Sequence, residues 1–393
     1  MRNAVIISAC LGLFCGWLAW CVPEPATPVW VQVAPQLDVS YVSDAKKGLR
    51  LSAHAAILFE NTTGTVLYAL NEHASRAPAS LTKMMTALLA IETGRLNDIV
   101  KVSRQAAGVS GSSAHLYTGQ EIRMEDLLYG MLLRSGNDAA VAVAEHLAGS
   151  VSAFANQMNA RAKELGAVNT HFVNPHGLDK PSHLTTAFDL AMIARVALLY
   201  PKFAEIVGTS RYLYEEQGVT WQNTNRLLWS YAGSEGIKTG TTGQAGPCLA
   251  AAAARADMEL IAVVLGSSNR WGDAIRLLDY GFNQFTLLKV AEKGVTLAEM
   301  KLAYSNRTLG LAAAGDLAAV VRATGDGPVS TRVVLNEIKL PIARHQRLGA
   351  YEVYVSGAKV ADIPLLAQQR VPAPSLLERI IYWITGSRQI PAA

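Results

Sequence analysis

The chain reads Ser80-Leu81-Thr82-Lys83 at the start of a segment whose apolar residues have helical spacing. In a helix, residues three positions apart lie on one face, so the Ser80 hydroxyl and the Lys83 amine can meet. A serine needs an adjacent base to become a good nucleophile, and a lysine is such a base only when burial or neighbouring cations lower its pKa. Taken alone, the same residues at a helix start more often cap the helix and face solvent. The motif therefore marks a candidate site that needs further support.

Two more short motifs follow this one. Ser135-Gly136-Asn137 comes 55 residues after Ser80, and Lys238-Thr239-Gly240 follows about 100 residues further on. Each has an ordinary structural explanation: a helix C-cap glycine with a new N-cap for the first, a strand entering a turn for the second. The three motifs in this order, however, are characteristic of class A β-lactamases and penicillin-binding proteins.

With these motifs the sequence resembles the low-molecular-weight penicillin-binding proteins, specifically the serine D-alanyl-D-alanine carboxypeptidases of peptidase family S11. The resemblance covers roughly residues 50–290. Further family-like stretches are Pro78-Ala79, Met85-Thr86, Asp138-Ala139, Asn174-Pro175-His176-Gly177-Leu178, Asn223 with Asn225, and Ala245-Gly246 with Cys248. The pair Gly243-Gln244 departs from the family, which more often has acidic residues there. It lies beside the expected site and bears on specificity rather than mechanism.

The resemblance implies a catalytic role for four residues. Ser80 attacks the carbonyl between the two terminal D-alanines of a peptidoglycan stem peptide, and Lys83 takes the serine proton. Ser135 relays a proton to the leaving D-alanine, and Asn137 orients Lys83 and the substrate amide. Water then hydrolyses the acyl-enzyme, and β-lactam antibiotics acylate the same serine.

The resemblance also implies a substrate-binding strand. Lys238 supplies positive charge near the substrate carboxylate, Thr239 hydrogen-bonds that carboxylate, and Gly240 leaves room for the substrate backbone. The backbone N–H groups of Ser80 and Thr241 form the oxyanion hole. Arg270 is a further candidate for carboxylate binding; the alternative is that it is an ordinary surface arginine. No metal or other cofactor is expected, and the spacing of the loop histidines His171, His176 and His183 matches no zinc motif.

The remaining pattern predicts a mixed α+β domain in which helices are inserted between early and late strands. The expected fold is a β-lactamase/transpeptidase-like domain at 45–288, with an antiparallel sheet flanked by helices. The expected strands are Ala55–Glu60, Thr65–Tyr68, Gly236–Thr239, Pro247–Ala254 and Leu260–Leu265; the expected helices are Ser80–Glu92, one from near Met124, Asp138–Leu147, Val151–Leu165, Asp189–Leu199 and Asp273–Phe285. Residues 166–186 are rich in Asn, Pro, Gly and His and are predicted to form a long loop.

After about residue 290 short alternating runs are separated by glycine-containing turns, which predicts a small all-β domain at 290–371. The runs Ala318–Arg322, Ser330–Leu335 and Tyr351–Val355 are its expected strands. With 393 residues, half of them apolar, the chain is long enough for both domains.

Both ends of the chain carry membrane signals. Residues 1–26 contain a positive start and an uncharged apolar run, as in a cleaved secretory signal; a retained anchor or a buried helix are the alternatives. The spacing of apolar residues in 375–388 predicts an amphipathic helix that is too short to cross a bilayer. It is expected to lie on the membrane surface or, alternatively, to pack on its own domain. The expected location is the outer face of the bacterial cytoplasmic membrane.

Charge and cysteine content support this organisation. The net charge of +4 is too small to indicate nucleic-acid binding, and all of it comes from residues 290–393, which hold 12 basic and 8 acidic residues. A local positive excess favours an anionic membrane surface. Three of the four cysteines lie within the first 21 residues, which excludes a disulfide framework.

Three rival functions use similar features. A class A β-lactamase needs a deacylating glutamate about 35 residues past the middle motif, where this chain reads His171-Phe172-Val173-Asn174, and it lacks the extra C-terminal module. A D,D-endopeptidase that cuts cross-links uses the same machinery. A non-catalytic wall-binding protein has no need of three intact motifs. Release of D-alanine from a pentapeptide separates these functions.

Overall fold

The computed structural model describes residues 40, 42, 49–302, 308–324 and 327–377. The predicted signal or anchor at 1–26 lies outside the described residues. So does the predicted amphipathic helix from residue 378 onward, of which only 375–377 are described, with Leu376 and Leu377 exposed. No helix among the described residues combines the length and the apolar character needed to cross a bilayer.

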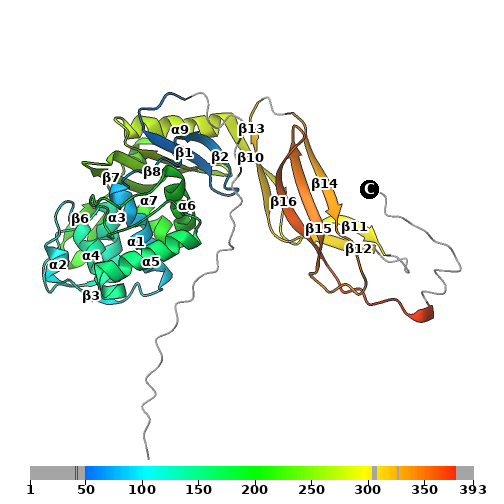
Figure 1. The fold of residues 1–393 in the computed structure, drawn as a ribbon, viewed down its shortest axis with the longest axis horizontal. Helices are drawn as coiled ribbons and strands as arrows, with labels where there is room; N and C mark the ends of the chain where they lie inside the picture. Colours follow the sequence, from blue (N-terminus) through cyan, green and yellow to red (C-terminus); the bar gives the residue numbers. More distant parts are fainter. Residues whose placement is uncertain (1–39, 41, 43–48, 303–307, 325–326, 378–393) are drawn as a thin grey trace, which may run out of the picture.

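An antiparallel five-stranded sheet in the order β2-β1-β9-β8-β7 forms the centre of the larger part (Figure 1). Its strands are β1 (Ala55–Glu60), β2 (Val66–Leu70), β7 (Ser234–Thr242), β8 (Gly246–Arg255) and β9 (Met258–Leu265). Alternate residues of β9 enter two different cores: Ile261, Val263 and Leu265 face one helical layer, whereas Leu260, Ala262 and Val264 face the other. Burial on both faces explains the continuous apolar runs of β8 and β9.

Helices cover both faces of this sheet. One face packs against α9 (Arg270–Gln284), with Leu227 of the short α8 (Leu227–Ser230) in the same core, and the other faces the longer helices (Figure 1). On that other face are α1 (Lys83–Glu92), α2 (Arg104–Ala107), α3 (Met124–Leu133), α4 (Asn137–Ala148), α5 (Val151–Glu164), α6 (Ala187–Leu198) and α7 (Pro201–Gly208); the 3₁₀ turns are η1 (Ala79–Thr82) and η2 (Glu215–Gln217). Every residue of α1 is buried, so its first residue, Lys83, enters the core directly from the site. The predicted mixed α+β fold is confirmed.

The structure differs from the predicted elements mainly at their ends. The expected helix from Ser80 begins as the 3₁₀ turn η1 and becomes α-helical only at Lys83, a common arrangement at helix starts. Two small hairpins were not expected: β3 (Ile99–Lys101) with β4 (Glu121–Arg123), and β5 (Arg211–Tyr214) with β6 (Val219–Gln222). Strands of three or four residues are too short to show an alternating pattern.

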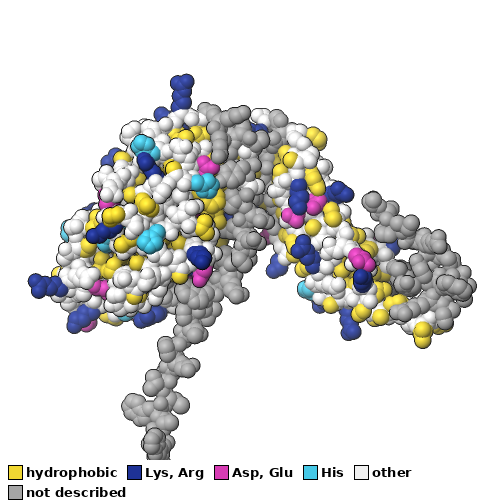
Figure 2. All heavy atoms as spheres, in the orientation of Figure 1, with side chains coloured by type: hydrophobic (Ala, Val, Ile, Leu, Met, Phe, Trp, Pro, Cys, Tyr) yellow, Lys and Arg dark blue, Asp and Glu magenta, His cyan; other side chains and the backbone are white. Residues whose placement is uncertain are grey.

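The C-terminal part consists of strands (Figure 1). A five-stranded sheet has the order β11-β12-β16-β15-β14, and a separate pair joins β10 to β13. The strands are β10 (Phe285–Ala291), β11 (Thr296–Lys301), β12 (Thr308–Ala313), β13 (Leu317–Arg322), β14 (Val329–Leu335), β15 (Arg347–Val355) and β16 (Ala358–Ala367). Basic and acidic side chains are interspersed on its visible face (Figure 2), so the positive excess of this region forms no broad patch there.

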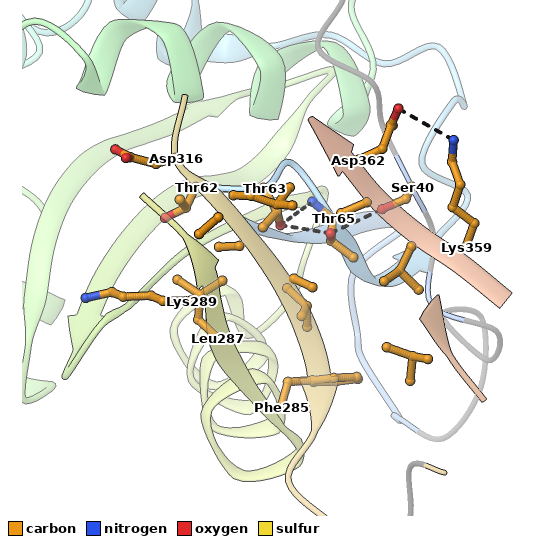
Figure 3. A pocket seen from close by; sticks show the side chains of 18 of the residues that line it. Ser40, Thr62, Thr63, Thr65, Phe285, Leu287, Lys289, Asp316, Lys359 and Asp362 are labelled. Carbon is orange, nitrogen blue, oxygen red and sulfur yellow. Dashed lines mark hydrogen bonds and ion pairs between the residues drawn. The ribbon is translucent and has the colours of Figure 1, made fainter. Parts of the chain in front are cut away.

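A cavity of about 1140 Å³ lies between the two parts, lined by the β1–β2 turn on one side and by β10, β13 and β16 on the other (Figure 3). Several of its polar groups pair with one another. Lys289 forms an ion pair with Asp257 at 2.7 Å, Lys359 lies 3.6 Å from Asp362, and the hydroxyls of Ser40 and Thr65 are 3.1 Å apart. None of the predicted site residues lines this cavity.

Candidate active site

The predicted nucleophile and base are in direct contact. Lys83 is fully buried, and its Nζ lies 3.1 Å from Ser80 Oγ. The same Nζ donates to Asn137 Oδ1 and to the backbone oxygen of His176, each at 2.7 Å. Both oxygens can only accept hydrogen bonds, so a neutral Lys83 amine donates its two N–H groups to them. Its lone pair can then accept a hydrogen bond from the Ser80 hydroxyl. This is the hydrogen-bond arrangement that a general base requires.

Electrostatics favour that neutral form. Burial is the main cause that lowers the pKa of Lys83 well below the usual lysine value, and the charge of Lys238 lowers it further, whereas Asp138 acts in the opposite direction. A lysine in this environment is a competent base at a pH where an exposed lysine is protonated.

The middle motif lies in the connection between α3 and α4. Ser135 is buried and has a left-handed backbone with φ of 63°, and Asn137 opens α4. The Asn137 side chain donates its Nδ2 hydrogen to Ser110 O at 2.7 Å, which leaves its carbonyl oxygen for Lys83. These bonds fix which end of the amide faces the lysine.

Asp138, the next residue, holds the adjacent loop. Its carboxylate accepts hydrogen bonds from the backbone of Ala114 and Leu116 and from the Ser113 hydroxyl. Sequence reasoning assigned no role to this residue beyond its family-like occurrence after Asn137.

The third motif lies on β7, which runs along the turn that carries Ser80. A Cβ added at Gly240 would be 2.9 Å from Ser80 N, so only glycine allows this approach without displacement. Lys238 is buried, and within the described part of the chain its Nζ has no hydrogen-bond partner. Burial lowers the pKa of Lys238 to about 7, with a further contribution from Arg270. Thr239 Oγ1 lies 2.7 Å from the hydroxyl of Thr224, a residue that was not predicted.

Arg270 begins α9 and is half-buried behind β7. Its Nη1 donates to Gly240 O and to Thr241 Oγ1, each at 2.9 Å. The arginine therefore supports the end of the motif strand through its backbone. Thr241 itself is exposed.

The loop 166–186 contributes contacts that its irregular sequence did not reveal. The His176 carbonyl accepts from Lys83, and Asp179 accepts from Thr242 Oγ1 at 2.6 Å and from Gln244 N at 3.0 Å. The loop thus touches both the base and the tip of the β7–β8 hairpin. Among the described residues no group of three or more His, Cys, Asp or Glu side chains is arranged to hold a metal ion.

The fold and these contacts define a serine acyl-transfer enzyme with a lysine base. Comparison with known proteins identifies the family: residues 42–269 match the Peptidase_S11 model, described as D-alanyl-D-alanine carboxypeptidase, and residues 285–373 match the penicillin-binding protein 5 C-terminal domain. The chain belongs to the S11 family of low-molecular-weight penicillin-binding proteins, which confirms the resemblance seen in the motifs.

Relatives and solved structures agree over most of the chain. The D-alanyl-D-alanine carboxypeptidase DacF of Bacillus subtilis is 35% identical over 83% of this chain and 88% of its own length. The D-alanyl-D-alanine carboxypeptidase DacD of Escherichia coli is 34% identical over 84% of this chain and 89% of its own length. Penicillin-binding protein 5 of Haemophilus influenzae superposes with a TM-score of 0.76 at 30% identity and covers 83% of this chain and 99% of that one. The match to a serine-to-alanine mutant of the Streptomyces K15 DD-transpeptidase covers 60% of this chain and 99% of the transpeptidase chain, with a TM-score of 0.58 at 33% identity.

Proposed function

We propose that this serine D-Ala-D-Ala carboxypeptidase removes the terminal D-alanine from peptidoglycan stem pentapeptides through an acyl-enzyme on Ser80. The observation that carries the proposal is the buried Lys83 amine, bonded to the Ser80 hydroxyl and to two acceptors that leave its lone pair free. The names of the relatives supply the substrate class.

In the acylation step, neutral Lys83 takes the proton of Ser80 Oγ as the oxygen attacks the carbonyl carbon of the penultimate D-alanine. The developing oxyanion accepts hydrogen bonds from the backbone N–H groups of Ser80 and Thr241. The C–N bond then breaks, and the proton passes from Lys83 through Ser135 to the leaving amine. The serine proton therefore ends on the released D-alanine, and Lys83 is neutral again for the next step.

Hydrolysis repeats this chemistry with water as the nucleophile. Water loses a proton to Lys83, attacks the ester carbonyl and releases Ser80 with its hydroxyl restored. A β-lactam presents the same amide inside a ring, so Ser80 opens the ring and the leaving nitrogen stays attached to the acyl group. Covalent labelling by penicillin follows from the same mechanism.

For the substrate carboxylate we propose Lys238, Thr239 and Arg270 as the recognising groups. A buried lysine amine without a protein partner is costly unless a ligand supplies the counter-charge. The Thr239 hydroxyl lies on the same strand, and Gly240 leaves the strand open for the substrate backbone. Arg270 contributes its positive charge and supports the strand end.

We also propose how the chain is organised at the cell envelope, where the family acts. Residues 1–26 export or anchor the protein, 45–288 form the catalytic domain and 290–371 form the β-rich domain. Residues 375–388 form an amphipathic helix that binds the outer face of the cytoplasmic membrane. The positive excess of the last quarter of the chain supports the membrane contact.

Mass spectrometry of a penicillin adduct, together with D-alanine release from a pentapeptide, tests the proposal. We expect the adduct on Ser80, loss of labelling and of D-alanine release in Ser80→Ala with the fold intact, and blocked acylation in Lys83→Ala. An adduct on another residue would refute the site. Covalent labelling without D-alanine release refutes the carboxypeptidase activity, and cleavage of cross-linked peptides in preference to pentapeptides identifies an endopeptidase.

A further inference from the structure

One histidine of the 166–186 loop lies against the back of the Ser80 turn. His183 is 1% exposed, and its Nε2 is 2.8 Å from Thr82 Oγ1. Its other ring nitrogen, Nδ1, accepts a hydrogen bond from the backbone N–H of Val173 at 2.9 Å. The ring therefore connects the loop to Thr82, one of the two residues between the nucleophile and the base.

These contacts determine the tautomer. The Val173 N–H can only donate, so Nδ1 is unprotonated and a neutral ring carries its hydrogen on Nε2. Nε2–H then donates to Thr82 Oγ1, and the Thr82 hydroxyl donates its own hydrogen to Ala79 O at 2.9 Å. The result is a directed chain of hydrogen bonds from Val173 N–H to the Ala79 carbonyl.

The end of this chain is a strained residue. Ala79 has φ of 49°, a left-handed conformation that is unfavourable for a residue with a Cβ, and it immediately precedes Ser80. Such a conformation persists only where surrounding groups hold it. The Thr82 hydroxyl holds the Ala79 carbonyl, and the hydrogen bond from His183 leaves that hydroxyl a single orientation for its hydrogen.

We propose that His183 is a positioning residue for acylation: through Thr82 it holds the Ala79 carbonyl and so fixes the direction in which Ser80 presents its hydroxyl to Lys83. The inference rests on the proposed function, because it concerns the same nucleophile. His183 touches neither the nucleophile nor the base, so its effect passes entirely through the Thr82 hydroxyl.

The surroundings keep the imidazole neutral. Burial lowers the pKa of His183 to about 4; His171, which faces it from the same loop, lowers it further, and Asp179 opposes the shift. His176 also lies close enough to interact with it, and Lys83 follows Thr82 on the facing helix. A neutral ring is required because Nδ1 must accept from Val173.

Two substitutions at His183 separate positioning from simple anchoring of the loop. In His183→Gln the amide nitrogen reaches the position of Nε2 and keeps the donor to Thr82, but the acceptor for Val173 is lost. In His183→Asn the amide oxygen takes the position of Nδ1 and keeps the bond to Val173, but the contact with Thr82 is lost. His171→Asn, at an exposed histidine of the same loop, is the matched control.

The measurement is the second-order rate constant of acylation by a fluorescent penicillin, recorded beside the melting temperature. We expect His183→Asn to acylate at least tenfold more slowly, His183→Gln to stay within threefold of the parent, and His171→Asn to match it. Thr82→Val, which removes only the hydroxyl, should reduce the acylation rate constant as much as His183→Asn does. The double variant with both substitutions should acylate no more slowly than either single variant.

Equal rates for the Asn and Gln variants of His183, or a parental rate in Thr82→Val, would overturn the inference. Rates that follow the melting temperatures, with Gln the worse of the two, would assign His183 to loop anchoring and also overturn it. If neither His183 variant folds, the comparison of Thr82→Val with Thr82→Ser decides. We expect Thr82→Val to acylate more slowly than the parent and Thr82→Ser, which keeps a hydroxyl, to acylate at the parental rate. A parental enzyme that penicillin does not acylate would refute the proposed function instead.

Discussion

Gly177→Ala tests the close approach between the 166–186 loop and the turn that carries Ser80. Gly177 has φ of 91°, and a Cβ built there would lie 1.8 Å from Ala79 O and 2.4 Å from Ala79 C. These are backbone atoms of a buried turn, so no flexible side chain can move aside. Either the loop or the Ser80 turn must shift.

The matched control is Gly166→Ala in the same loop. Gly166 also has a left-handed backbone, with φ of 79°, but a Cβ there meets nothing within 4 Å. The control therefore carries only the conformational cost, roughly 1–2 kcal/mol. Gly177→Ala carries that cost and the displacement of packed atoms, for which overpacking typically adds about 1–3 kcal/mol.

The assay combines thermal unfolding with the rate of penicillin acylation. At roughly 2–4 °C per kcal/mol for a domain of this size, Gly166→Ala should lower the melting temperature by about 2–8 °C, and Gly177→Ala by a further 2–12 °C. Acylation should stay parental in Gly166→Ala and fall at least tenfold in Gly177→Ala, because the shift disturbs Ala79 before Ser80 and the His176 carbonyl that binds Lys83. Equal melting temperatures for the two variants, with parental acylation in both, would refute the reasoning.

Four further outcomes are expected. The pKa of His183 is about 4 in the folded protein and about 6.5 when unfolded, so its contribution to the free energy of unfolding falls as the pH drops from 6.5 to 4, by up to about 3 kcal/mol. His183→Gln should make the slope of melting curves against pH shallower, and the slope that remains should come in part from His176, whose pKa is lowered to about 3. The acylation rate should rise with pH as Lys83 loses its proton and level off well below pH 10; a rate still rising like an ordinary lysine titration would contradict the lowered pKa. Glu92→Gln breaks a buried ion pair with Arg161 and should destabilise the fold by about 3–5 kcal/mol in denaturant titration, while the folded enzyme acylates normally. Deletion of 375–393 should move the protein from the membrane to the soluble fraction, and continued pelleting would favour a retained N-terminal anchor.

The central sheet was predictable because its strands leave a clear pattern. Burial on both faces of β8 and β9 requires continuous apolar runs, and the chain has these at Pro247–Ala254 and Leu260–Leu265. The short hairpins were not predictable for the opposite reason. In β3, for example, only Val100 is buried among three residues, and a single buried residue has no period.

The site was predictable only where side chains carry the chemistry. Ser80, Lys83 and Asn137 could be selected by residue type and motif spacing, and they lie in contact in the structure. The second acceptor around Lys83 is the backbone oxygen of His176, and a carbonyl has no signature in the sequence. The link from His183 to Thr82 spans 101 residues of chain, and nothing local to either residue indicates it. Residue type also could not show that Arg270 donates from Nη1 to Gly240 O and Thr241 Oγ1; its predicted role in carboxylate binding stays a prediction.

The two buried lysines differ in a way that separates their roles. Lys83 has three oxygen neighbours within 3.1 Å, so its amine is satisfied in the free enzyme and its burial favours loss of the proton. Lys238 is as deeply buried, yet no described group accepts from its Nζ, and Arg270 adds a second positive charge nearby. Such a group is stabilised only when a ligand brings an acceptor, and two adjacent cations select an anionic one. Binding of a carboxylate would raise the pKa of Lys238 again and restore its charge.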